Sequence, residues 1–204
     1  MKNRKFIIII VTLILCVSLG IAVASSKDFP GKKEATQIGI EMSESVNALI
    51  DPSKKSDEIT MGVVLGEKIS KDYFNWEYSL CKATGSKEPA KRAWELIKLE
   101  IYERNLAIKE GFMPTQEEIK KCSDEMRAVV ESTEDSHNLV RTIAKQMNMT
   151  EDAYWNDYQA KYEAPLQLIH SRVDEYLKKN NLAKPSPDEI EGEIYEINYF
   201  NSLN

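Results

Sequence analysis

Apolar side chains recur every three or four positions along most of this chain, which is the spacing of α-helices. The longest such run lies at about 88–111, where the apolar positions form a stripe wider than that of a surface helix. Pro89 suits the first turn because its missing N–H costs nothing there, and Gly111 suits the left-handed residue just past a helix end. The pattern therefore predicts a central helix that other elements cover on several sides.

Start signals predict further helices on both sides of it. Ser70 can cap a short helix, and Thr115 with Glu118 forms a capping box before another. Apolar residues of a further short amphipathic helix follow at 139–147. Each of these segments is expected to bury one face.

The last third of the chain predicts a long helix and a short one. Apolar residues keep the helical spacing from about 150 to 179, and Pro165 within this run predicts a kink because proline removes a backbone hydrogen bond. A final helix is expected to restart at 185–189 and to carry Ile190, Ile194 and Phe200. One short extended segment at 59–65 ends in a tight turn. The predicted fold is all-α, an irregular bundle of about five to six helices around 88–111.

The N-terminus reads as an export signal. Residues 1–5 are basic and residues 6–24 are apolar or small almost throughout. Cleavage after Ala24 and retention as a membrane anchor both stay open, and Cys16 follows a leucine, which disfavours lipid attachment. In either case the bulk of the chain, from Ser25 onward, is expected outside the cytoplasm, secreted or anchored to the cell membrane.

Residues 25–60 are polar and interpreted as a linker that leads into a domain at 61–204. Within the linker, apolar residues at near-helical spacing predict a short amphipathic helix at about 35–50. It could bind a membrane surface or a partner, but loose packing on the main domain is the preferred interpretation.

Composition and charge narrow the classes of function. The net charge is −6 and the sequence pI about 5.2, so a nucleic-acid partner is not expected. Cys81 and Cys122 lack metal-ligand spacing, and a disulfide between them is as plausible as two buried thiols. His137 and His170 stand far apart without triad or metal spacing. We therefore predict no catalytic residue, no metal and no cofactor.

Large aromatic and methionine side chains are the candidate binding residues. Most should be core, but such side chains also suit shallow grooves that accept varied apolar peptides. The candidates lie on the 150–179 helix and just after Gly111: Tyr154, Trp155, Tyr158, Tyr162, Phe112 and Met113.

Four ordered motifs resemble the SurA-type N-terminal chaperone domain, which is also found in PrsA-like foldases and is related to the peptide-binding region of trigger factor. They are VLGEKISKDYF at 64–74, AIKEG at 107–111, FMPTQEEI at 112–119 and MTEDAY at 149–154. The match departs from the family pattern where Leu65 replaces an asparagine and Asn148 a glycine, and where Asp72 and Tyr73 fall one position early.

The resemblance implies an exported chaperone-like module that binds unfolded or extended segments of secreted proteins. In the family a parvulin-type prolyl isomerase domain often follows, whereas this sequence ends at Asn204, so no enzyme activity is expected. The alternative is a membrane-anchored helical adaptor with one envelope partner. Residues 6–24 would contact the membrane if uncleaved, and a homodimer stays open.

Overall fold

The computed structural model describes residues 32–50 and 59–203, and the predicted export signal lies outside these ranges. The described chain is mostly helical, with a small antiparallel sheet. In order, its elements are α2 (Lys32–Ile50), β1 (Thr60–Val64), β2 (Glu67–Ser70), α3 (Lys71–Ala83), α4 (Pro89–Glu110), α5 (Gln116–Glu131), α6 (Glu134–Gln146), α7 (Glu151–Ala153), η2 (Tyr154–Glu163), α8 (Ala164–Lys179), η3 (Pro187–Glu189), β3 (Gly192–Ile194) and α9 (Ile197–Ser202).

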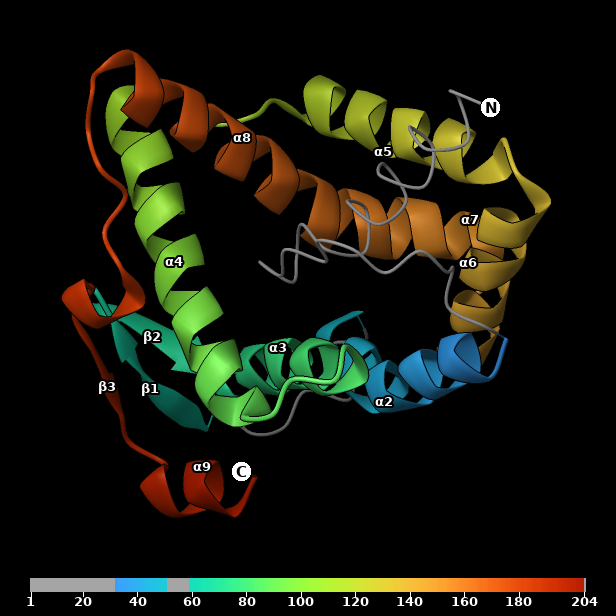
Figure 1. Cartoon of the computed structure of the whole chain (residues 1–204), viewed down its shortest axis with the longest axis horizontal. Helices are drawn as coiled ribbons and strands as arrows, with labels where there is room; N and C mark the ends of the chain where they lie inside the picture. The colour runs from blue at the N-terminus through green and yellow to red at the C-terminus, as the bar shows by residue number, and fades with distance from the viewer. Residues whose placement is uncertain (1–31, 51–58, 204) are drawn as a thin grey trace.

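The helices follow the edges of a frame (Figure 1). α4 forms one side, α8 and α5 run along the next, α6 and α7 form the opposite side, and α2 with α3 closes the frame. The predicted helix at 88–111 is therefore present, with Pro89 in its first turn and Gly111 in the left-handed conformation at its end. It forms a side of the frame and not the centre of a bundle, and α3, α8, β1 and η3 contact it.

The hydrophobic core is correspondingly divided into three clusters. The first joins α2, α3, α5, α6 and η2, the second joins the sheet, α3 and α4, and the third joins α4 and α8. A compact single domain usually has one contiguous core. The division follows from the frame, because each corner buries its own apolar surface.

The prediction of an all-α fold is wrong in one respect. β1 pairs with β2 in a hairpin, and β3 pairs with the other edge of β1. Leu65 and Gly66 form the hairpin turn with φ values of 47° and 83°, the left-handed conformation that both central residues of a type I′ turn adopt. At Gly62 an added Cβ would lie 2.8 Å from Trp94 Cη2, so glycine lets the sheet approach α4.

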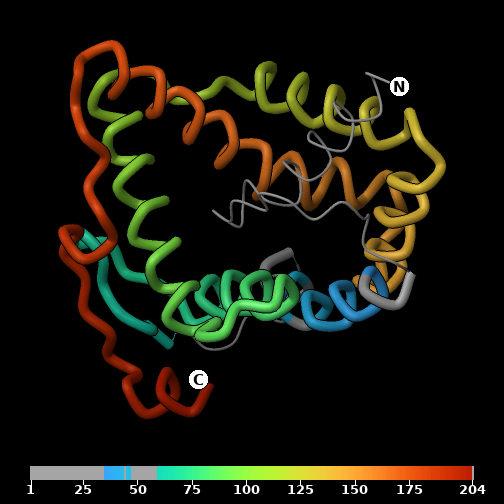
Figure 2. The backbone as a smooth tube through the Cα atoms, viewed as in Figure 1, coloured from blue at the N-terminus to red at the C-terminus, as the bar shows by residue number. Residues whose placement is uncertain are grey.

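The predicted last helix is also corrected. Ser186 and Glu189 form the expected capping box, but only the single 3₁₀ turn η3 follows. The chain after α8 runs back along α4 to the sheet (Figure 2), where Gly192–Ile194 pairs with β1 and Ile190 is buried in the second cluster. Residues 192–194 therefore form a strand on β1 and not a helix. A short helix, α9, begins only after this strand.

The predicted linker helix is present as α2 and belongs to the folded core. Ala35, Met42 and Val46 are buried in the first cluster, and α2 packs against α3 and α6. At Gly39 an added Cβ would lie 2.4 Å from Gln146 Cβ, so this glycine permits close packing on α6. Loose packing was expected for this helix, whereas α2 packs closely on α3 and α6. Among the described residues, no helix is both long and apolar enough to span a bilayer.

Candidate functional site

Half of the predicted peptide-binding residues are buried. Tyr154, Trp155 and Tyr158 keep 3%, 2% and 1% of their surface exposed and pack inside the first cluster. Trp155 is further fixed by a hydrogen bond from Ser123 Oγ to its carbonyl oxygen, at 3.1 Å. Side chains this deeply buried stabilise the core, so the prediction that these three line an open groove is corrected.

The other three candidates do not share one surface. Tyr162 is partly exposed and its ring centre lies 6.2 Å from that of Trp76. Phe112 packs on Tyr176 at 5.6 Å in the third cluster, and Met113, next to it, is 40% exposed. Phe112 and Met113 thus belong to the α4–α5 junction, and only Tyr162 stays near the predicted stripe.

The predicted long helix contains a π-helical stretch directly before Pro165. Tyr154–Glu163 forms η2, in which the backbone hydrogen bonds span five residues, and α8 continues from Ala164. Side chains five positions apart then lie over one another. Gln159 Nε2 donates to Tyr154 Oη at 3.1 Å, and Tyr158 Oη donates to Glu163 at 2.6 Å. The wider winding therefore brings the Glu163 carboxyl into the protein interior.

Two further carboxyls, those of Glu77 and Glu100, lie next to each other at the junction of α3 and α4. Glu77 is fully buried, and no donor among the described residues reaches either of its oxygens. Its carboxyl faces that of Glu100, which also accepts a hydrogen bond from Tyr73 Oη at 2.5 Å. Two facing carboxyls can form a hydrogen bond only when one of them holds a proton. We call Glu77, Glu100 and Glu163, with Tyr73 and Tyr158, the buried cluster.

The electrostatics of the buried cluster favour neutral carboxyls. Burial, with the charges of Glu100 and Glu163, raises the pKa of Glu77 well above its usual range. Burial also raises the pKa of Glu100 to about 7, although the hydrogen bonds from Tyr73 and Glu77 act in the opposite direction. The pair therefore holds at least one proton near neutral pH.

Part of the buried cluster is accessible. Tyr73 and Tyr162 are partly exposed, and both contact the buried Trp76, at ring distances of 5.5 Å and 6.2 Å. Glu100, bonded to Tyr73, also keeps part of its surface exposed. We call Tyr73, Tyr162 and Glu100 the Tyr73–Tyr162 surface. It can offer aromatic faces and one carboxyl to a ligand.

Sequence reasoning missed all three glutamates of the buried cluster. Glu77 follows Phe74 by three positions and precedes Cys81 by four, so it falls on the apolar face of α3. A glutamate within an apolar stripe was the sequence signal that could have predicted a buried carboxyl at Glu77. Glu163 could not be found in this way, because its place depends on the five-residue winding of η2.

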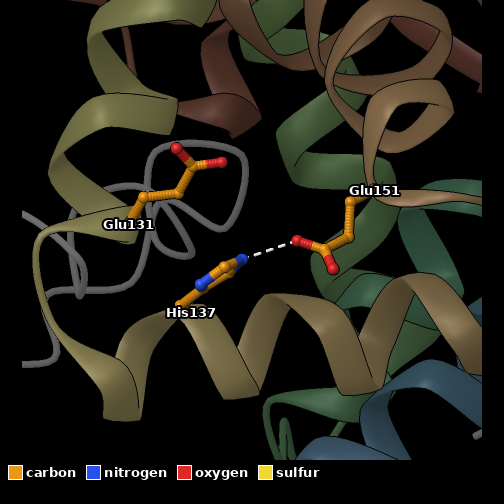
Figure 3. Close-up of side chains that lie close together, drawn as sticks. All are labelled: Glu131, His137 and Glu151. Carbon is orange, nitrogen blue, oxygen red and sulfur yellow. Dashed lines mark hydrogen bonds and ion pairs between the residues drawn. The ribbon is translucent and has the colours of Figure 1, made fainter.

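A separate surface cluster brings together Glu131, His137 and Glu151 from α5, α6 and α7 (Figure 3). Their ligand atoms lie within 4.8 Å of one another, which is a spacing that could hold a metal ion. His137 Nε2 lies 2.6 Å from Glu151, however, and Arg141 also bonds Glu151 at 2.9 Å.

Arg127 completes the surface cluster by bonding Glu131 at 2.7 Å. Arg141, with His137, lowers the pKa of Glu151. Arg127 also bonds Asp152 at 2.8 Å, so both carboxylates of the surface cluster already have an arginine partner. The surface cluster is best described as ion pairs that join the ends of three helices.

His170 has a similar structural place. It bonds the buried Glu103 at 3.0 Å, and Lys184 bonds the same carboxylate at 2.8 Å. Glu103 is the largest cause of the raised pKa of His170. These contacts attach α8 and the returning segment to α4. Cys81 and Cys122 are free thiols, so the disulfide alternative is not realised.

Comparison with known proteins gives no relative: no family model, no curated protein and no solved structure matches this chain.

Proposed function

We propose that this protein is an exported, non-catalytic chaperone-like module that binds unfolded or extended segments of secreted proteins. The proposal draws on the export signal and on the ordered motifs that resemble the SurA-type domain. The structural observation that supports it best is the Tyr73–Tyr162 surface, where partly exposed aromatic rings from α3 and η2 flank a buried tryptophan. This surface replaces the buried stripe as the place to look for binding.

The frame also supports the proposal. Separate hydrophobic clusters leave partly exposed apolar side chains at their margins, and Tyr73, Tyr162 and Leu166 all pack against the first cluster in this way. Aromatic side chains provide much of the contact energy in peptide recognition because they bury large areas with little loss of conformational freedom. A shallow aromatic surface of this kind suits weak binding of varied apolar segments.

The test is binding of apolar peptides and suppression of aggregation of an unfolded client by the purified protein. Tyr162→Ala should weaken binding, because it removes an exposed ring from the proposed surface. Tyr195→Ala is the matched control, since Tyr195 is 52% exposed and directly follows β3, outside the Tyr73–Tyr162 surface. No binding at roughly tens of micromolar protein would contradict the proposal. Capture of one stoichiometric partner, with no effect on unfolded clients, would favour the adaptor.

A further inference from the structure

We propose that the Tyr73–Tyr162 surface selects segments with a basic side chain, and that Glu100 and Glu77 bind its ammonium or guanidinium group. This inference rests on the proposed function and specifies the class of peptide it would take. The reason is that hydrogen-bond acceptors outnumber donors at the junction of α3, α4 and η2.

The buried cluster has acceptors without donors. Both oxygens of Glu77 are buried, and apart from the proton that the carboxyl shares with Glu100 no donor among the described residues reaches them. Such atoms are costly, because burial removes the water that would otherwise bond them. A lysine ammonium brings three donors and an arginine guanidinium five, so either group can satisfy Glu77 and Glu100 together.

The basic groups nearest to the cluster are already committed. Arg104 of α4 pairs with Glu67 of β2, and Arg92 bonds Glu95 at 3.2 Å. Lys184 and His170 bond Glu103. Glu163 raises the pKa of both Glu77 and Glu100, Glu103 raises that of Glu100, and Arg92 offsets this only in part at Glu77, so the surroundings of the pair are negative on balance.

An organic cation fits this surface better than a metal ion. Within the described ranges, three-ligand convergence to within 4.8 Å occurs at the surface cluster, and the three glutamates of the buried cluster do not converge so closely. A lysine or arginine side chain needs no such convergence. Its alkyl stem can lie along the rings of Tyr73 and Tyr162, which attract a cation through their faces.

Binding exchanges one cation for one proton. When the ligand binds, the carboxyl pair releases its shared proton to solvent. The basic side chain keeps its own protons, and its positive charge neutralises the carboxylate charge that remains. Affinity for the basic side chain should therefore rise as pH increases through the range where the pair titrates. The titratable and charged groups around the pair are Tyr73 and Cys81 from α3, Arg92, Glu103 and Arg104 from α4, and Glu163 from η2.

The experiment compares two short fluorescent apolar peptides that are identical except for one central residue, lysine or norleucine. At about pH 8 the protein should bind the lysine peptide about tenfold more tightly, and this ratio should shrink at about pH 5.5. Calorimetry in buffers of different ionisation enthalpy should show that protons are released on binding of the lysine peptide alone.

Variants assign the effect to the carboxyl pair. Glu100→Gln should remove the lysine preference, so that the two peptides bind with similar affinity at each pH. Glu77→Gln should reduce the preference as a second, independent variant. Glu175→Gln, at an exposed position on α8, is the matched control and should keep the preference. His170→Gln tests whether the pH dependence comes from this histidine, and it should also keep it.

The outcomes separate the inference from the proposed function. Equal binding of both peptides at each pH would overturn the inference while the chaperone-like function stands. Binding of neither peptide would overturn both. A lysine preference that survives in both Glu100→Gln and Glu77→Gln would also overturn the inference, because another acidic group would then be responsible.

Discussion

The two glutamate clusters of this protein differ in how their charge is balanced. In the surface cluster, Arg127 and Arg141 bond Glu131 and Glu151, and the groups are partly or fully exposed to solvent. In the buried cluster, Glu77 is fully buried and its carboxyl faces that of Glu100. The same residue type is thus neutralised by arginine at one place and by a proton at the other.

This difference shows which cluster is available for function. Exposed ion pairs contribute little to stability and leave no bonding capacity unused. A buried acceptor without a donor destabilises the fold unless something supplies the missing hydrogen bond. The buried cluster is therefore where a proton, or a ligand that replaces it, has the larger effect.

The largest expected effect tests whether the aromatic residues of η2 are core. Tyr158→Ala should lower the free energy of unfolding by about 3–5 kcal/mol, because it opens a cavity and removes the hydrogen bonds to Trp76 and Glu163. Tyr158→Phe should cost about 1–2 kcal/mol, since only the hydroxyl is lost. Urea denaturation measures both. A loss for Tyr158→Ala no greater than for exposed Tyr195→Ala would contradict the burial of this stripe.

The next effect is the pH dependence of stability. The folded state binds more protons than the unfolded state wherever a carboxyl pKa is raised, as for Glu100 from 4.5 to about 7. This contribution is fully present below about pH 4.5 and is lost as pH rises through about 7. Stability should fall by on the order of 1–3 kcal/mol across this window. His170, whose pKa is also raised, acts in the same direction. A stability that rises from acid to neutral pH would contradict this balance.

A third prediction isolates the carboxyl pair from His170. Glu77→Gln keeps the shape of the side chain, cannot ionise and can donate to Glu100. It should therefore stabilise the protein at about pH 8, by about 1–2 kcal/mol, and change little at about pH 5. Chemical denaturation at the two pH values measures the difference. Destabilisation at the higher pH would mean that an ionised Glu77 is favourably paired.

The smallest effect is expected in the surface cluster. Arg141→Ala should cost no more than about 1 kcal/mol, because the pair with Glu151 is exposed and screened by solvent. Adding Zn²⁺ should leave the melting temperature of the wild-type protein unchanged. A marked stabilisation by Zn²⁺ that is lost in His137→Ala would show that the cluster binds metal after all.

The helices and their ends were predictable from sequence, because apolar spacing and capping residues act locally. Thr115 with Glu118 and Gly111 mark their helix ends as expected. The extended segment at 59–65 and its turn were also predicted and are present as β1 and the Leu65–Gly66 turn. The other two strands were not, since β2 carries one buried apolar residue, Ile69, and β3 is stabilised by pairing with distant β1. The frame was also not predictable, because an apolar stripe shows how much of α4 is covered but not by what.

The candidate site was predictable only in its residue types. Sequence indicated that aromatic residues near 154–162 matter, but not which of them are buried. The π-helical winding of η2 turns Tyr158 and Glu163 toward each other, and no local pattern distinguishes this from an α-helix. The pairing of Glu77 with Glu100 depends on how α3 crosses α4, which is a tertiary contact.

Titration of the side-chain carboxyls of Glu77 and Glu100 by carbon-detected NMR tests the central claim most directly. Assignment can rest on the variants Glu77→Gln and Glu100→Gln. The structure predicts that the pair takes up a proton in a step near pH 7, well above the ordinary value of 4.5. Titration of both carboxyls near the ordinary value would show that the pair is ionised at neutral pH, and would contradict the account.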